Sequence, residues 1–363
     1  MLSRRAFLTA LGALALPLPA LASGPARTLL AAAADDGGPF FGATGGPLLG
    51  AAGGLLPSAA GGKAVPLAGR GHGIVPVPGT TQAIVVARRA GYWLARIDWA
   101  AGALLREAEA APERHFFGHA LLSPDGTTLY TTENDIASGR GVIGVWDAAS
   151  LRRRGEFGSH GIGPHELVWL VPGRRLAVAN GGILTLPESG RIKLNLAQMA
   201  PSLAVVDVAD GRLVAEHVLP DRTLSLRHLA IAADGTLGIA IQAESPDGRP
   251  VDDAPLLAVL RDGALTLAAT APGLGGYAAS IAAHGNVFAL TATRGNALAL
   301  WGSDGTPLAA IAHPKPAGVA SDGTRLWVSN ETGMIAEADL KRRVLTPLLT
   351  RAGTRWDNHL VLA

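Results

Sequence analysis

Five of the ten histidines occupy one position of a repeated sequence unit, and together they are the residues of this chain that could do chemistry. They are His72, His119, His165, His228 and His359. Neutral imidazole nitrogens suit zinc, copper, iron and nickel, so a convergence of these side chains would form a transition-metal site. The alternative is structural capping, in which each histidine bonds a hydroxyl group within its own repeat and binds no ligand. The chain has no cysteine, which excludes thiolate ligands, iron–sulfur clusters and disulfides.

The repeated unit that must position these histidines has a period near 45 residues. Each unit holds a short apolar strand, a glycine-containing turn and three further strands, which is typical of one blade of a β-propeller. The innermost strands are expected to start near the five histidines and near Ala278 and Pro316. The sequence therefore predicts an all-β fold, a seven-bladed β-propeller.

The two ends of the chain are expected to close this ring. The chain ends four residues after His359, while residues 28–34, 39–49 and 64–67 form three unpaired strand-like segments. A C-terminal strand that joins this N-terminal blade would remove both free sheet edges. The alternative is that residues 37–62, rich in glycine and alanine, form a linker.

Polar residues accompany the histidines at the predicted channel mouth. In a propeller the start of the innermost strand and the loop after the second strand lie on one face, so these groups should line one cup. Glu133 and Glu166 are candidates for carboxylates that orient the imidazole rings. The candidate ligand-binding residues are Arg70, Glu133, Asn134, Glu166, Asn180, Arg191, Arg227, Gln242, Tyr277 and Asn358.

The third unit carries an insertion of roughly 17 residues within positions 181–200, long enough to cover a site. In it, Arg191, Lys193 and Asn195 alternate along the chain and would share one face of an extended segment. That arrangement suits an anion or carboxylate partner, and it equally suits a solvated edge.

The first 22 residues are predicted to be a twin-arginine export signal. Arg4 and Arg5 precede an apolar stretch, and Ala20-Leu21-Ala22 has the pattern of a cleavage site. The alternatives are an ordinary secretory signal and an N-terminal anchor. We expect a periplasmic protein whose residues 23–363 form a single propeller domain.

Composition and motifs exclude several classes of function. The chain has 31 lysine and arginine residues and 29 aspartate and glutamate residues, and without Arg4 and Arg5 the two numbers are equal at 29. The net charge therefore gives no reason to expect nucleic-acid binding. No apolar run beyond residue 25 is long enough to span a bilayer. The motifs of common hydrolases, zinc proteases, phosphate-binding loops and quinoproteins are absent from the sequence.

Nearly the whole of residues 23–363 carries motifs that resemble one family. They include Arg70-Gly-His72-Gly, Gly161-Ile-Gly-Pro-His165-Glu-Leu, Leu226-Arg-His228-Leu-Ala and Trp356-Asp-Asn-His359. The chain resembles the twin-arginine-exported family known as domain of unknown function 1513. The resemblance implies a periplasmic seven-bladed propeller. Members of this family often lie beside imelysin-type and di-haem proteins linked to iron acquisition, which implies a role in iron handling.

One departure from the family pattern is visible. Where the family commonly has Thr-His-Pro, this chain has Thr185-Leu186-Pro187, which implies a reduced site or a different ligand.

Three hypotheses of function follow from these observations. The first is a monomeric periplasmic propeller that binds a transition metal, iron or copper, or a metal-bearing partner at its channel mouth, as an accessory to metal acquisition with periplasmic iron-uptake proteins. The second is a mononuclear metal oxidoreductase. The third is a metal-free scaffold for protein interactions.

Overall fold

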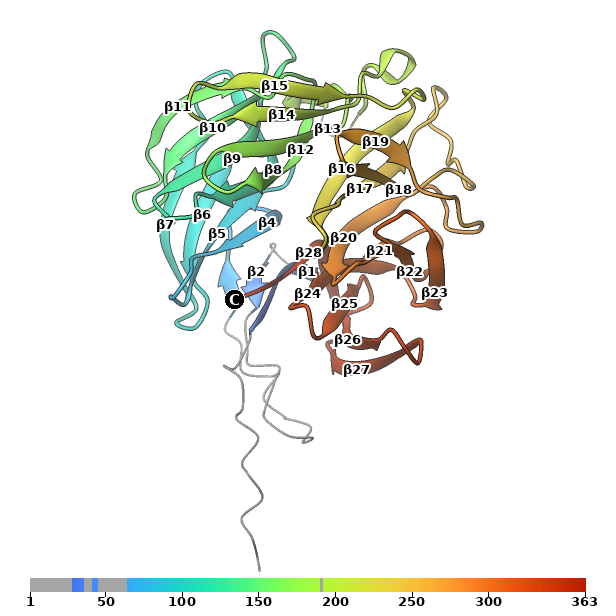
Figure 1. Ribbon diagram of the computed structural model, residues 1–363. Coiled ribbons are helices and arrows are strands. Elements are labelled where there is room, and N and C mark those ends of the chain that lie inside the picture. The colour runs from blue at the N-terminus through green and yellow to red at the C-terminus, as the bar shows by residue number, and fades with distance from the viewer. Residues whose placement is uncertain (1–27, 36–40, 45–63, 190–191) are drawn as a thin grey trace, which may run out of the picture.

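The computed structural model describes residues 28–35, 41–44, 64–189 and 192–363 (Figure 1). The predicted export signal, Arg191 and most of the predicted linker segment lie outside these residues. Among the described residues no helix is long and apolar enough to cross a membrane.

The described chain is a β-propeller whose strands pair antiparallel into four-stranded sheets, and the all-β prediction is confirmed. Six of the sheets consist of consecutive strands. The first three are β4 (Gly71–Pro76), β5 (Gln82–Ala87), β6 (Trp93–Asp98) and β7 (Ala103–Glu109); β8 (Arg114–Leu122), β9 (Thr128–Asp135), β10 (Gly141–Asp147) and β11 (Arg153–Gly158); and β12 (Pro164–Val171), β13 (Arg175–Asn180), β14 (Ser202–Asp207) and β15 (Arg212–His217).

The next three are β16 (Leu224–Ile231), β17 (Leu237–Ala243), β18 (Leu257–Arg261) and β19 (Ala264–Leu267); β20 (Ala278–His284), β21 (Val287–Ala292), β22 (Ala297–Gly302) and β23 (Pro307–Ala312); and β24 (Pro316–Ser321), β25 (Leu326–Asn330), β26 (Met334–Asp339) and β27 (Val344–Thr350). Glycines with positive φ, such as Gly126 and Gly173, make the turns between first and second strands, where residues with a side chain would be strained.

A further four-stranded sheet joins the two ends of the chain. Its order is β28 (Thr354–Leu362), β1 (Leu29–Asp35), β2 (Phe41–Thr44) and β3 (Ala64–Pro66). Leu29 pairs with Leu362 in this composite sheet, and the backbone of Thr28 bonds that of Ala363. The C-terminal strand thus pairs with the N-terminal strand as the sequence predicts, and this pairing joins the two ends of the chain in one sheet.

The first strands of the sheets surround the channel. Each of β4, β8, β12, β16, β20, β24 and β28 contacts the first strands of its two neighbours, and β28 contacts β4. Apolar side chains fill the space between adjacent sheets, for example Phe116 and Trp146 against Ile84 and Leu94. The outermost strands β7 and β11 are more exposed. This packing fixes the first strands and, with them, the side chains that they direct into the channel.

The predicted insertion lies between β13 and β14 and contains two short 3₁₀ turns, η2 (Pro187–Ser189) and η3 (Leu196–Gln198). Asn195 holds it together: its Oδ1 accepts a hydrogen bond from the Leu184 backbone (2.7 Å) and its Nδ2 donates to the Gly182 carbonyl (2.9 Å). Lys193 forms an ion pair with Glu244, which follows β17. The insertion therefore reaches the neighbouring sheet beside the channel.

Candidate functional site at the channel histidines

Backbone irregularities in the first strands direct the five histidines into the channel. The pairing of β4 with β5 shifts register between Gly71 and Ile74, which brackets His72, and equivalent shifts bracket His119, His165 and His228. A bulge of this kind leaves a residue outside the ladder and turns its side chain. His359 likewise lies between Trp356 and Leu360, where β28 loses its regular pairing with β1.

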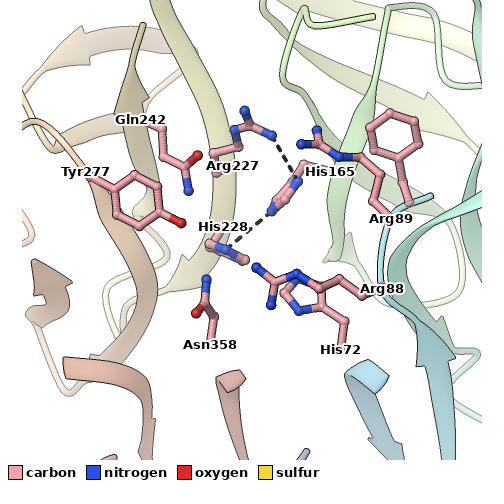
Figure 2. Close-up of a pocket in the computed structure, with 10 residues that line it drawn as sticks. His72, Arg88, Arg89, His165, Arg227, His228, Gln242, Tyr277 and Asn358 are labelled. Carbon is pink, nitrogen blue, oxygen red and sulfur yellow. Dashed lines mark hydrogen bonds between the residues drawn. The ribbon is translucent and has the colours of Figure 1, made fainter. Parts of the chain in front are cut away.

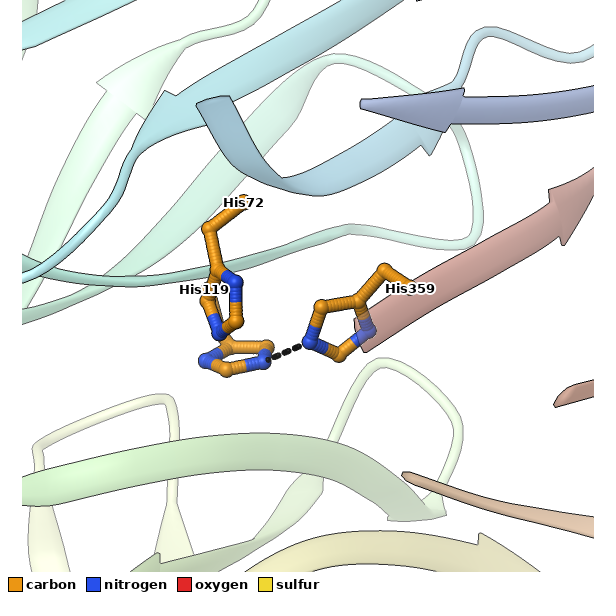
Figure 3. Close-up of side chains that lie close together, drawn as sticks. All are labelled: His72, His119 and His359. Atoms are coloured by element: carbon orange, nitrogen blue, oxygen red, sulfur yellow. Dashed lines mark hydrogen bonds between the residues drawn. The ribbon is translucent and has the colours of Figure 1, made fainter. Parts of the chain in front are cut away.

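The five imidazoles form one buried cluster. Neighbouring ring centroids lie 4.5–4.9 Å apart for the pairs His72–His359, His72–His119 and His165–His228. His165 Nε2 is 3.3 Å from His228 Nε2 (Figure 2), and His119 Nε2 is 2.8 Å from His359 Nε2 (Figure 3). None of the five residues is more than 9% exposed. The cluster is thus one continuous group of nitrogen donors, which we call the histidine cluster.

Glycine allows the rings to pack this closely. Gly118 has a φ of 110°, and a Cβ atom there would lie 2.7 Å from Cδ2 of His72. A side chain at position 118 would therefore displace the His72 ring.

Two carboxylates hold two of the rings in a defined orientation. Asp357 Oδ1 lies 2.6 Å from His72 Nδ1, and Glu166 Oε2 lies 3.2 Å from His228 Nδ1. An ionised carboxylate only accepts hydrogen bonds, so each Nδ1 carries the proton and each Nε2 keeps its lone pair. A carboxylate behind an imidazole in this way is the usual partner of a histidine that binds a metal.

The remaining rings are held differently. Arg227 Nη1 donates to His165 Nδ1 (3.4 Å), and because a guanidinium has no acceptor, the neutral His165 ring carries its proton on Nε2 and donates it to His228. Nδ1 of His119 is buried without a hydrogen-bond partner among the described residues. A buried polar atom without a hydrogen-bond partner is uncommon in proteins, and such atoms often have a functional role.

Asp357 is the main electrostatic anchor of the cluster. Besides His72 it pairs with Arg70 (2.6 Å) and Arg88, and it is 1% exposed. Burial acts to raise the pKa of Asp357, but Arg88, His72 and Arg70 outweigh it and hold that pKa well below its ordinary value. For Glu166, burial also acts to raise the pKa, and the hydrogen bond from His228 lowers it overall. Both carboxylates are therefore ionised at neutral pH.

Burial disfavours protonation of the imidazoles. It lowers the pKa of His72, His119 and His165 well below the ordinary value, and it lowers that of His359 to about 4. Neighbouring imidazoles lower these values further, whereas Asp357 acts in the opposite direction on His72. Neutral imidazoles are the form that binds metal ions.

These pKa values predict an acid-sensitive fold for the metal-free protein. An unfolded histidine has a pKa of about 6.5, so the unfolded chain binds more protons than the folded one between about pH 6.5 and pH 4. Stability present above about pH 6.5 is lost as the pH falls through this window, by roughly 3 kcal/mol for His359 alone. Urea unfolding at pH 7.5 and pH 4.5 in the presence of a chelator measures the change. Equal stability at the two values would contradict the prediction.

Several residues predicted to line the site do not join the histidine cluster. Glu133 lies within its own sheet, where its carboxylate accepts hydrogen bonds from Thr131, Trp146 (3.0 Å) and Arg153 (3.0 Å). It occupies the space beside Gly144, where a Cβ would lie 1.8 Å from Glu133 Oε1. Glu133 therefore does not orient an imidazole, and Glu166 alone of the two candidates does.

Two amides also serve the backbone rather than the channel. Asn180 exchanges hydrogen bonds with Ser159, at 2.9 Å to the hydroxyl and 3.0 Å to the carbonyl, and Asn134 donates to the Asp135 carbonyl. Both are almost fully buried. Their positions at the ends of second strands are as predicted, but their side chains support the connections there.

Other predicted residues do gather beside the cluster. One cavity is lined by His72, His165, His228, Arg227, Gln242, Tyr277 and Asn358 (Figure 2). Arg70 does not line it but bonds Asp357, which in turn bonds His72. Sequence reasoning did not identify Arg88, Arg89 and Phe117, which line the same cavity, nor the role of Asp357. Asp357 had a signal in the sequence, an acidic residue two positions before an in-register histidine. Arg88 and Arg89 follow β5 and belong to no repeated motif.

Comparisons with known proteins support the family and the fold. The profile of a family described as "Protein of unknown function (DUF1513)" matches residues 65–363. Comparison with curated proteins finds no significant match.

Three solved structures resemble the chain, each over 80% of its length, at 14–16% sequence identity. Similarity at this level shows the fold alone. They include hydrazine synthase of Kuenenia stuttgartiensis, with 86% of that chain covered and a TM-score of 0.55. The others are the WD40 repeats of RRP9, with 83% covered and a TM-score of 0.59, and U3-55K, with 84% covered and a TM-score of 0.58.

Proposed function

This chain belongs to the family of proteins of unknown function DUF1513, and from the histidine cluster in its channel we propose that it binds a transition-metal ion. The ligands would come from His72, His119, His165, His228 and His359. The observation that carries the proposal is the pair of carboxylate–imidazole contacts, Asp357–His72 and Glu166–His228. Each contact places the ring proton on Nδ1, so Nε2 is the nitrogen that can bind a metal ion, and on His228 the ion would replace the hydrogen bond from His165.

The donor atoms fit a metal ion in number and spacing. Two sets of three imidazoles have ligand atoms within 4.8 Å of one another: His72, His119 and His359, and His119, His165 and His228. Two nitrogens bound to one tetrahedral ion at about 2.0–2.1 Å lie roughly 3.3 Å apart. The Nε2 atoms of His165 and His228 are 3.3 Å apart, and an ion bound by both would replace the proton that His165 Nε2 holds in the metal-free protein. The donor set therefore fits an ion that prefers imidazole, with iron and copper as our first candidates.

The proposal also covers the closure of the propeller, the location of the protein and its partners. The composite sheet of β28, β1, β2 and β3 acts as the seventh blade, so that the propeller closes around the cluster. The N-terminal 22 residues direct export by the twin-arginine route to the periplasm. There the protein acts as a monomer that assists metal acquisition together with iron-uptake proteins.

A metal oxidoreductase is the second candidate. The observation in its favour is the cavity next to His72, His165 and His228, which would let a small molecule reach a metal held there. An ion bound by protein ligands on only part of its coordination sphere can carry redox or Lewis-acid chemistry. Turnover of a redox dye by the metal-loaded protein, absent from the metal-free protein, would favour this function over simple binding.

Elemental analysis of protein purified after native export tests the proposal. We expect about one iron or copper ion per chain, retained through gel filtration at neutral pH and released at about pH 4, where imidazoles protonate. Protein that holds no ion as isolated, nor after incubation with iron(II), copper(II) or zinc(II), would contradict the proposal and favour a metal-free scaffold for protein interactions.

A further inference from the structure

The cavity beside the histidine cluster is lined by three arginines. Arg88 and Arg89 come from the segment after β5, and Arg227 comes from β16 on the other side. In Figure 2 their guanidinium groups point toward one space, and the hydroxyl of Tyr277 points into it from the opposite wall. Gln242 and Asn358 add amide groups between them. Nearly every polar group at this cavity can thus donate a hydrogen bond.

No acidic residue is among the described residues that line the cavity. The two carboxylates that pair with its arginines are each shared between two cations. Asp357 pairs with both Arg70 and Arg88, and Glu244 pairs with both Lys193 and Arg227 (3.6 Å). Four cationic side chains therefore share two carboxylates at these ion pairs, which leaves the paired groups with a net positive charge.

The geometry of the donors favours a carboxylate. The planar guanidinium fork matches the two oxygens of a carboxylate, and such bonds are among the strongest hydrogen bonds in proteins. Carboxylate oxygen is also a common ligand of transition metals. Because His72, His165 and His228 line the same cavity, an anion bound by the arginines would lie against the proposed metal ligands.

We propose that this arginine-lined cavity binds a carboxylate anion, so that the channel takes its metal as a metal–carboxylate complex rather than as a bare ion. The second half of this statement rests on the proposed function. The first half concerns the arginines alone and holds for metal-free protein as well. The arginines would bind the outer carboxylate oxygens, and the imidazoles would bind the metal.

Calorimetric titration with oxalate tests the anion site on metal-free, full-length protein in a chloride-poor buffer. We expect saturable binding at one site, weakened about tenfold or more in Arg89→Gln, since a hydrogen bond to a charged group contributes about 1.5–3 kcal/mol. The matched control is Arg106→Gln on the outer strand β7, which should bind oxalate as the unmodified protein does. Tyr277→Phe provides a second, milder variant, because a phenyl ring can keep the contact with Arg294 and lacks only the hydroxyl.

Equilibrium dialysis then separates this inference from the proposed function. Copper(II) and oxalate retained together in equal amounts by the unmodified protein would support the metal–carboxylate complex. In the absence of oxalate, the Arg89→Gln variant should bind copper(II) within about threefold of the affinity of the unmodified protein. Oxalate bound by protein that retains none of copper(II), iron(II) and zinc(II) would leave the anion site but overturn the metal–carboxylate complex and the proposed function together. The inference as a whole is overturned if oxalate does not bind, if Arg89→Gln and Arg106→Gln behave alike, or if phosphate binds more tightly than oxalate.

Discussion

Replacement of His119 and His165 together by alanine is expected to lower metal affinity by more than about a hundredfold. Changes to partners that only orient a ligand already cost about 10–100-fold, and this variant removes two donors from the centre of the cluster. His119 belongs to both sets of three imidazoles, so neither set survives the change. Competition with a chromophoric chelator, read for copper(II) or zinc(II), measures the loss.

The fold of this variant should persist. His119 and His165 contact other imidazoles rather than the apolar clusters between the sheets, and water can fill the polar space that alanine leaves. The matched control is His160→Ala with His217→Ala, two histidines outside the cluster. Unchanged metal affinity in the His119/His165 variant, or an equal loss in the control, would remove the histidine cluster as the metal site.

The architecture could be predicted from the sequence because a propeller repeats local information. A first strand followed by a glycine turn recurs through the chain, and the segments expected at 28–34 and 64–67 are strands at Leu29–Asp35 and Ala64–Pro66. The same repeat brought the five histidines together, since a fixed position in each unit reaches one place around the channel. The repeat position thus predicted that histidines almost 290 residues apart in the sequence lie together in the folded chain.

Residues outside the repeat could not be placed in this way. Glu133 was predicted to line the channel mouth. The side chains of a strand alternate between two faces, however, and the side chains of Thr131 and Glu133 contact Trp146 within their own sheet. The sequence does not state which face a residue takes where bulges interrupt the ladder. Arg88 and Asp357 pair because β28 lies beside β4 in the folded chain, a contact between opposite ends of the sequence.

His115 shows the same limit. It lies outside the position that the repeat directs to the channel. The side chain is fully buried and stacks on Phe117, with ring centroids 5.4 Å apart. Phe117 in turn lines the cavity, so His115 supports its wall from behind.

Asp357→Asn is expected to affect stability more than any other single change at the site. It leaves Arg88, 14% exposed, without its counter-charge, and it weakens the contacts to Arg70 and His72. Removal of one partner from a buried ion pair costs about 3–5 kcal/mol. Metal affinity should also fall by about 10–100-fold, because His72 loses the group that fixes its tautomer. Urea unfolding of metal-free protein and chelator competition measure the two effects separately.

Glu166→Gln is the matched control, the same chemical change at the other carboxylate. Glu166 accepts hydrogen bonds from His228 Nδ1 and from the Leu229 backbone at 2.8 Å, and no guanidinium pairs with it among the described residues. We therefore expect a similar loss of metal affinity but a smaller loss of stability than for Asp357→Asn. If both carboxylates only supported the fold, each variant would lose stability and keep its metal affinity. If both only oriented metal ligands, the two variants would unfold at the same urea concentration. The expected split, with affinity lost in both and stability lost mainly in Asp357→Asn, follows only if Asp357 both orients His72 and neutralises Arg88.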